Sequence, residues 1–138
     1  MAQALCSGVA ALVLIVVDSR DARALYGEYL EFCAFRVMKT EDREEAIAIA
    51  RAEQPAVILM DLAMPAFDGC EAIRQLRADP QTADIPIVAL SAHAFGDEPD
   101  RARAAGADLC LTMPCLPSQV GRVVRAMLWR RELVRSPA

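Results

Sequence analysis

The chain has 138 residues, of which 55% are hydrophobic and 25% charged, and its formal net charge is −4 at pH 7. This length predicts a single domain, with a core over about residues 12–133 and short flexible termini. The negative balance argues against nucleic acid as a partner, because nucleic-acid-binding domains carry basic surfaces. The apolar run Val9–Val17 is too short to span a bilayer and has no basic residue before it, so it predicts a buried strand and no membrane or export segment.

The cysteine pattern favours a reducing compartment. Five cysteines and a single histidine, His93, occur without any Cys-x-x-Cys spacing. Such a set suits neither a zinc site nor a disulfide framework and is typical of a cytoplasmic protein with buried thiols. A redox switch built on Cys110 and Cys115 stays open as an alternative.

Strand-like and helix-like segments alternate along the chain. The predicted strands are the apolar runs Leu12–Val17, Phe35–Met38, Val57–Asp61, Pro86–Leu90 and Asp108–Thr112. The predicted helices carry apolar residues at helical spacing and are Asp21–Cys33, Asp42–Glu53, Cys70–Ala78, a segment from near Pro99 to Gly106, and Ser118–Leu133. Five such units with short connections predict an α/β fold: a doubly wound, five-stranded parallel sheet, (βα)₅, with helices on both faces in three α/β/α layers.

Polar residues stand where the predicted strands end. They are Asp18, Asp61, Ser91 and the turn Thr112–Pro114. The carboxyl ends of parallel strands meet at one edge of a sheet, so these residues are expected to be neighbours, although each alone is also a common turn residue.

The two aspartates predict a metal-assisted chemistry. With the backbone carbonyl of Ala63, they supply the oxygen ligands that Mg²⁺ prefers. Without a cation, two carboxylates about 4 Å apart would repel by about 4 kcal/mol at an effective dielectric constant near 20. A carboxylate beside Mg²⁺ can attack a phosphoryl group and form an acyl phosphate, and the Ser91 hydroxyl can donate a hydrogen bond to a phosphoryl oxygen.

Four segments resemble the receiver domain of bacterial response regulators. They are Leu14–Asp18, Leu59–Gly69, Val88–Ala94 and Ala104–Pro114. The block Met-Asp-Leu-x-Met-Pro-x-x-Asp-Gly, residues 60–69, is specific, and the similarity runs from about Leu12 to Leu128. The resemblance implies a flavodoxin-like fold with Asp61 as phospho-acceptor. It also implies that Asp18, Asp61 and the Ala63 carbonyl bind Mg²⁺, and that Ser91 follows the phosphoryl group on activation.

The resemblance also implies partners. A stand-alone receiver takes its phosphoryl group from a histidine kinase or a histidine phosphotransfer protein in a phosphorelay and signals through contacts with a downstream protein. It is not an enzyme beyond its own phosphorylation. It is expected to be a cytoplasmic monomer or weak homodimer, without nucleic-acid or membrane binding.

Three positions depart from the family pattern. Val17 replaces the first of two adjacent acids, Met113 replaces the lysine before the fifth-strand proline, and Cys110 replaces the aromatic switch residue. These departures leave open a pseudo-receiver that binds its partner independently of phosphorylation. A flavodoxin-like or thiol redox enzyme is a more distant alternative, because Asp18–Asp21 stands where a glycine-rich phosphate-binding loop would follow the first strand.

Several other side chains are expected to be solvated or to pack in the core. His93 is expected to be solvated, and Tyr26 and Tyr29 are expected to pack in the core or to border a kinase-docking surface. The arginines of the last helix are expected to form a solvated face and are Arg122, Arg125, Arg130 and Arg131.

Overall fold

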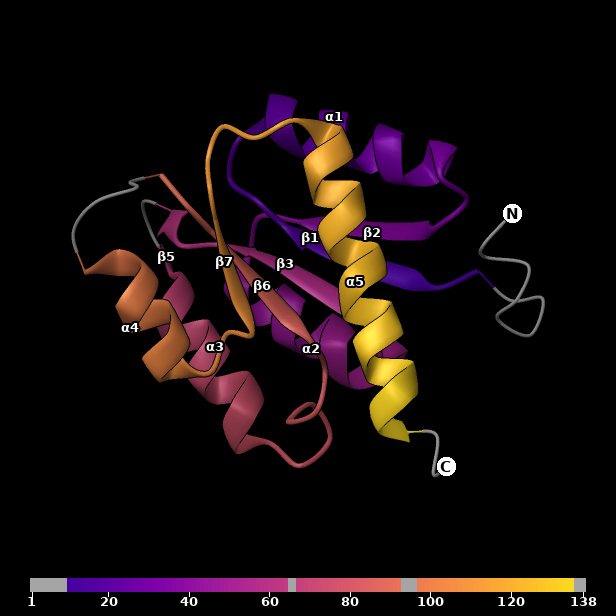
Figure 1. Ribbon diagram of the computed structural model, residues 1–138. Helices are drawn as coiled ribbons and strands as arrows, with labels where there is room; N and C mark the ends of the chain where they lie inside the picture. The colour runs from indigo at the N-terminus through magenta and orange to yellow at the C-terminus, as the bar shows by residue number, and fades with distance from the viewer. Residues whose placement is uncertain (1–9, 65–66, 93–96, 136–138) are drawn as a thin grey trace.

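The computed structural model describes residues 10–64, 67–92 and 97–135 (Figure 1). The strands are β1 (Leu12–Val16), β2 (Arg36–Thr40), β3 (Val57–Asp61), β4 (Ala63–Met64), β5 (Phe67–Asp68), β6 (Ile87–Ser91) and β7 (Leu109–Thr112). The helices are α1 (Arg20–Phe32), α2 (Arg43–Glu53), α3 (Gly69–Ala78), α4 (Glu98–Ala105) and α5 (Pro117–Arg135).

Five strands form one parallel sheet in the order β2-β1-β3-β6-β7. The order confirms the doubly wound architecture predicted from the sequence. From β1 the chain goes outward to β2 and then returns to β3 on the other side of β1. In open α/β sheets, ligands bind at the strand ends beside such a reversal, and β1 and β3 are the strands that deliver Asp18 and Asp61 there.

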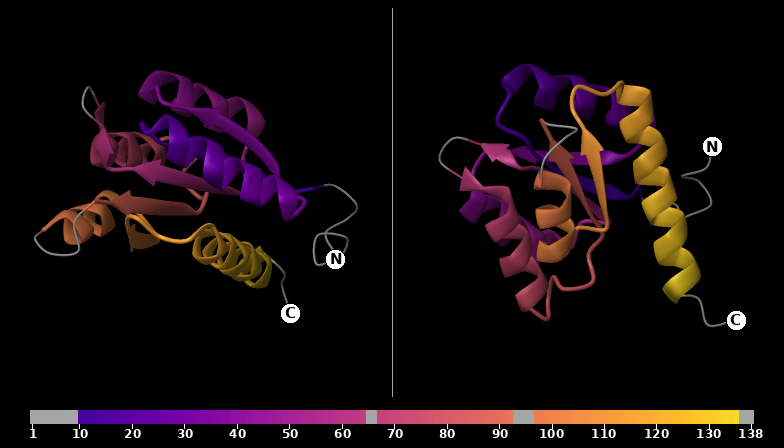
Figure 2. Two further views of the ribbon diagram at one scale, coloured as in Figure 1. Left: turned by 90° about the horizontal axis from the view of Figure 1, so that it is seen from above. Right: turned by 60° about the vertical axis from the view of Figure 1, so that its left-hand side comes forward.

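The sheet lies between two helical layers (Figure 2). Helices α1 and α5 cover one face, where Val13 and Ile15 of β1 join the core, and α2, α3 and α4 cover the other, where Leu14 and Val16 do so. All five residues of β1 are buried, because side chains alternate between two covered faces. The central strands are therefore almost entirely apolar, and the polar residues gather where they end.

The helices begin at side-chain caps that the sequence carries. Ser19, Asp42 and Asp68 accept hydrogen bonds from the backbone amides of Ala22, Glu45 and Cys70 at the starts of α1, α2 and α3. The helix predicted from Asp42 thus begins where the structure has it, with Asp42 as its capping residue. Helix α4 ends at Gly106, whose φ of 122° suits a residue without Cβ.

Some element boundaries differ from the sequence prediction. Strand β2 runs over Arg36–Thr40 instead of Phe35–Met38, because it pairs residue by residue with Leu12–Val16 of β1. The antiparallel pair β4–β5 was not predicted, since two-residue strands are too short to show a period. None of the helices within the described residues has the length and apolar composition needed to cross a bilayer.

Gly69, at the start of α3, packs directly behind the Asp61 backbone. A Cβ at this position would lie 2.6 Å from the Asp61 carbonyl oxygen and 2.8 Å from Leu62 Cα. We expect Gly69→Ala to lower the free energy of unfolding by about 2 kcal/mol, because backbone atoms cannot give way as a side chain can. Urea denaturation measures the change. The matched control is Gly27→Ala within α1, where the nearest atom belongs to the flexible Lys39 side chain and little or no loss is expected. Equal stability of the Gly69→Ala variant and the parent would contradict this prediction.

Candidate functional site

Two aspartates meet in a cavity of about 250 Å³ at the carboxyl edge of the sheet. Asp18 follows β1 and is exposed, and Asp61 ends β3 and is half-buried. The cavity is lined by Val17, Asp18, Ser19, Ala22, Asp61, Ala92 and Met113. Asp18, Asp61 and the turn after β7 are thus brought together, as the topology argument predicted.

Ser91 has a different environment. It ends β6, is fully buried, and its hydroxyl donates a hydrogen bond to the Glu98 carboxylate on α4. Ala92, the next residue, lines the cavity, whereas Ser91 does not. The hydroxyl is therefore directed to α4 in this conformation and must exchange one acceptor for another to reach a group on Asp61.

Val17 is 1% exposed and packs in the core beneath α1 and α5. Its carbonyl accepts a 2.6 Å hydrogen bond from the Arg23 guanidinium, which also donates to the Asp18 carbonyl at 3.1 Å and lies 3.5 Å from a Glu41 carboxylate oxygen. Arg23 therefore fixes the backbone that carries Asp18. This role of Arg23 was not predicted from the sequence. The only sequence feature that could have indicated it is the position of Arg23 one turn into α1.

Met113 faces the cavity from one side and a small sulfur cluster from the other. Its Sδ lies 3.4 Å from the Tyr26 hydroxyl and 3.8 Å from Cys115 Sγ, while the hydroxyl donates to the Cys115 carbonyl at 3.0 Å. Tyr26 is 3% exposed, which confirms that it packs in the core. Burial, followed by the contacts with Cys115, raises the pKa of Tyr26 from 10.0 to about 12.

This shift predicts a stability change at alkaline pH. The folded state holds the Tyr26 proton more tightly than the unfolded state, so the contribution is complete below pH 10 and is lost as the pH rises to about 12. We expect the free energy of unfolding to fall by about 2 kcal/mol over this window, and Tyr26→Phe to abolish that part of the fall. Urea titrations at pH 9 and above measure it. A Tyr26→Phe variant with the same alkaline slope as the parent would refute this.

The cysteine pair proposed as a redox switch is not brought together. Cys110 packs on the α3 and α4 side of the sheet, and Cys115 on the α1 and α5 side. Burial, then the charge of Glu98, raises the pKa of the Cys110 thiol, and burial, then Asp68, raises the pKa of Cys70. Both thiols are thereby made poor nucleophiles.

The remaining predicted residues are spread over the fold. The backbone of Ala63, two residues after Asp61, begins β4 and pairs with Asp68. Tyr29 is half-buried, and Arg122, Arg125 and Arg130 are exposed on α5. His93 and the Arg131 side chain lie outside the described residues.

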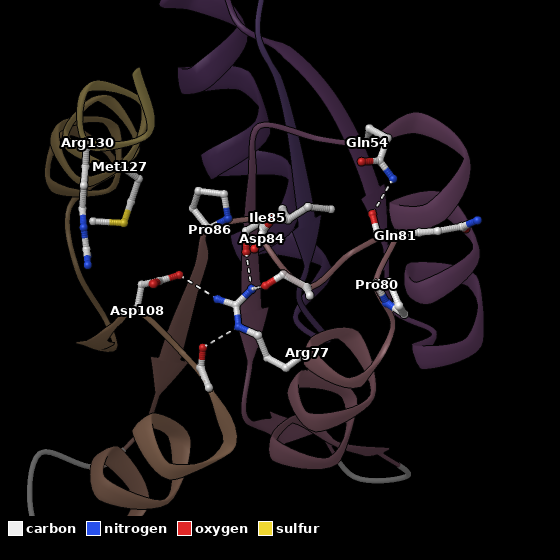
Figure 3. A pocket seen from close by; sticks show the side chains of 12 residues that line it. Gln54, Arg77, Pro80, Gln81, Asp84, Ile85, Pro86, Asp108, Met127 and Arg130 are labelled. Atoms are coloured by element: carbon white, nitrogen blue, oxygen red, sulfur yellow. Dashed lines mark hydrogen bonds and ion pairs between the residues drawn. The ribbon is translucent and has the colours of Figure 1, made fainter. Parts of the chain in front are cut away.

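A larger cavity of about 620 Å³ is lined largely by the loops before β6 and β7 (Figure 3). These loops lie where the strands begin, at the edge of the sheet opposite to the aspartates. The centre of the cavity is Arg77 of α3, whose guanidinium donates to the carbonyls of Gly106, Ala83 and Ile85 and to the Asp108 carboxylate, at 2.6–2.8 Å. These bonds occupy four of the five N–H groups of an arginine. The Arg77 donors at the centre of this cavity are therefore already used in hydrogen bonds within the protein, which argues against a ligand site here.

The donor set at the aspartate cavity suits Mg²⁺ better than a softer metal. Among the described residues, no three His, Cys, Asp or Glu side chains gather closely enough to hold a metal alone. Mg²⁺ commonly binds through one or two carboxylates and keeps several waters, which matches Asp18 and Asp61.

Comparison with known proteins agrees with this geometry. The sequence model of the family described as "Response regulator receiver domain" matches residues 13–125. The phosphate regulon transcriptional regulatory protein PhoB of Pseudomonas aeruginosa is 31% identical over 118 residues, 86% of this chain and 52% of PhoB. Protein PilH of the same organism is 32% identical, over 86% of this chain and 98% of PilH. The chain thus spans about half the length of PhoB and nearly all of PilH.

Solved structures show the same fold. The chemotaxis response regulator CheY4 of Vibrio cholerae superposes with a TM-score of 0.81 at 28% identity, over 87% of this chain and all of CheY4. The receiver domain of the sensor histidine kinase PA1611 from Pseudomonas aeruginosa, described with a magnesium ion coordinated in its active site cleft, has a TM-score of 0.81 at 26% identity and covers 88% of this chain and 99% of its own. The chain therefore belongs to the response regulator receiver domain family, and its flavodoxin-like fold is that of CheY.

Proposed function

We propose that Asp61 accepts a phosphoryl group from a histidine kinase or a histidine phosphotransfer protein. The observation that carries this proposal is the position of Asp61: it ends a fully apolar central strand and shares a cavity with Asp18. A half-buried carboxylate at this point is open to a donor and is held by the sheet behind it. Residues 12–133 would form the receiver, and the described cysteines, all free thiols, suit the cytoplasm.

Residues at and around the aspartate cavity have separate roles in this phosphoryl transfer. An Asp61 carboxylate oxygen attacks phosphorus, the bond from phosphorus to the donor's imidazole nitrogen breaks, and an acyl phosphate forms on Asp61. Asp18, Asp61 and the Ala63 carbonyl would hold Mg²⁺, whose charge neutralises the phosphoryl oxygens. Arg23 keeps the Asp18 backbone in place. Ser91 would exchange Glu98 for a phosphoryl oxygen as its acceptor.

Labelling of Asp61 tests this proposal directly. The purified chain is incubated with acetyl phosphate and Mg²⁺, and the adduct is located by mass spectrometry. We expect one phosphoryl group on Asp61, no adduct with EDTA, and none in Asp61→Asn. A chain that stays unmodified with both acetyl phosphate and beryllofluoride would exclude the proposal.

A second function, binding of a partner without phosphorylation, is favoured by two positions. Val17 is buried where the family has a further acid, and Met113 brings an apolar side chain into the cavity in place of a cation. A pseudo-receiver of this kind would bind its downstream protein equally well as wild type and as Asp61→Asn. A receiver would lose binding in that variant.

A further inference from the structure

Glu98 is an acidic side chain that is directed into the protein. It is the first residue of α4, is half-buried, and accepts a hydrogen bond from the fully buried Ser91 hydroxyl. After burial, its charge is the largest cause that raises the pKa of the Cys110 thiol, and it also raises the pKa of Cys70, after burial and Asp68. The Glu98 carboxylate therefore lies on the inner side of α4, near the end of β6, β7 and the start of α3.

The Ser91 hydroxyl compensates the Glu98 carboxylate for part of its lost hydration. Within the described part of the chain, no ion pair includes Glu98. A half-buried carboxylate without a cation depends on hydrogen-bond donors, and a bond from a hydroxyl to an ionised group is stronger than one between neutral groups. The bond between Ser91 and Glu98 therefore ties the first turn of α4 to the end of β6.

The backbone of Ser91 is fixed close to Asp61. Ser91 pairs with Thr112 of β7, and its carbonyl accepts a 2.6 Å hydrogen bond from the Met113 amide. It also directly follows Leu90, the residue of β6 that is in register with Asp61. Rotation about the Cα–Cβ bond is therefore enough to redirect the Ser91 hydroxyl. This hydroxyl has a single hydrogen to donate, so two acceptors compete for it.

We propose that Glu98 is a positioning residue that competes with a phosphoryl group on Asp61 for the Ser91 hydrogen, a proposal that rests on the proposed function of Asp61. In the free chain, the hydroxyl donates to Glu98 and holds α4 against β6. When the hydroxyl donates to a phosphoryl oxygen, Glu98 loses this donor, and hydration of its carboxylate favours release of the first turn of α4. This exchange of acceptors links Asp61 to α4 although Cys110 stands at the position of the aromatic switch residue.

Beryllofluoride binding measures the competition. With Mg²⁺, this anion occupies the place of a phosphoryl group on a carboxylate. We expect Glu98→Ala to lower the beryllofluoride dissociation constant about tenfold, because Ser91 is then free to donate to the new acceptor. In a Ser91→Ala background the same change should have no effect, because no shared hydrogen remains. Asp100→Ala removes another acid, an exposed one, from the first turn of α4 and should bind beryllofluoride as the parent does.

Amide hydrogen exchange follows the contact between α4 and β6 without any phosphoryl group. The Arg101 amide donates to the Asp97 carbonyl at 2.8 Å and closes the first turn of α4. We expect Ser91→Ala to raise the exchange rate of this amide about fivefold or more, because the carboxylate above it loses its donor. The Ala46 amide donates to the Asp42 carbonyl at 2.9 Å in the equivalent position of α2 and should keep its rate.

The two measurements separate this proposal from the proposed function. A parent chain that takes up no beryllofluoride would contradict phosphorylation of Asp61, and the exchange rate of the Arg101 amide would then decide whether Ser91 and Glu98 hold α4. Unchanged exchange in Ser91→Ala would overturn the proposal, as would equal beryllofluoride affinity of Glu98→Ala and the parent. A gain in affinity that persists in the Ser91→Ala background would also overturn it, since the charge of Glu98 alone would then be the cause.

Discussion

Replacing Arg77 with Met is expected to lower the free energy of unfolding by about 3 kcal/mol. The guanidinium ties the end of α3 to the loops before β6 and β7 through three carbonyls and the Asp108 carboxylate. Hydrogen bonds to charged groups contribute about 1.5–3 kcal/mol each, but the side chain is 21% exposed and water would replace some of them. Urea denaturation with an unchanged m-value measures the loss.

Arg74, on the same helix, supplies the control. Its guanidinium is 52% exposed and pairs with Glu71, three residues away, at 3.2 Å. We expect Arg74→Met to change stability by no more than about 0.5 kcal/mol. Arg77→Lys keeps the charge but not the fork of donors, so it should lose most of what Arg77→Met loses. Equal stability of the Arg74→Met and Arg77→Met variants would show that the cluster around Arg77 is not structural.

The architecture was predictable because its signals are local. Runs such as Val57–Met60 are short and have no polar face, which favours strands buried on both sides, and their alternation with helical patterns left few topologies. Asp42 indicated the start of α2 through its own side chain. The β4–β5 pair has no such signal, because its partners are two residues long and its pairing depends on the turn between them.

The site was predictable only in outline. Strand ends place Asp18 and Asp61 together whatever their side chains do, so topology sufficed for them. The partner of Ser91 is Glu98, from another element, and the partners of Arg77 come from two loops. Such contacts depend on distances between elements that a periodic pattern does not encode.

The departures from the family have a common physical consequence. Val17 and Met113 both exchange a charged side chain for an apolar one, and both contact the hydrophobic cluster beneath α1 and α5. The core gains apolar contacts there, while the aspartate cavity lacks one acid that would help to hold a cation and the lysine whose positive charge would face a phosphoryl dianion. A Mg²⁺ ion held by Asp18 and Asp61 would have to balance that negative charge without the lysine, which is a reason to expect slow phosphorylation of Asp61.

Replacing Met113 with Lys is accordingly expected to raise the rate of Mg²⁺-dependent phosphorylation of Asp61 by acetyl phosphate about tenfold or more. Met113 and Asp61 line the same cavity, so an ammonium group from this position can reach a phosphoryl oxygen. A charge-assisted hydrogen bond of about 1.5–3 kcal/mol corresponds to a factor of roughly 10 to 150 in rate. The change also removes the Met113 sulfur from Tyr26 and Cys115, so some stability should be lost.

Two controls separate the position of the charge from its mere presence. Met113→Leu keeps an apolar side chain in the cavity and should react at the parent rate. Thr112→Lys adds the same charge one residue earlier, on an exposed side chain outside the cavity, and should accelerate the reaction little. If all three variants react alike, the side chain at 113 does not meet the phosphoryl group. If only Met113→Lys is fast, the parent reacts slowly because no positively charged side chain faces the phosphoryl group. Asp61 itself is then a competent nucleophile.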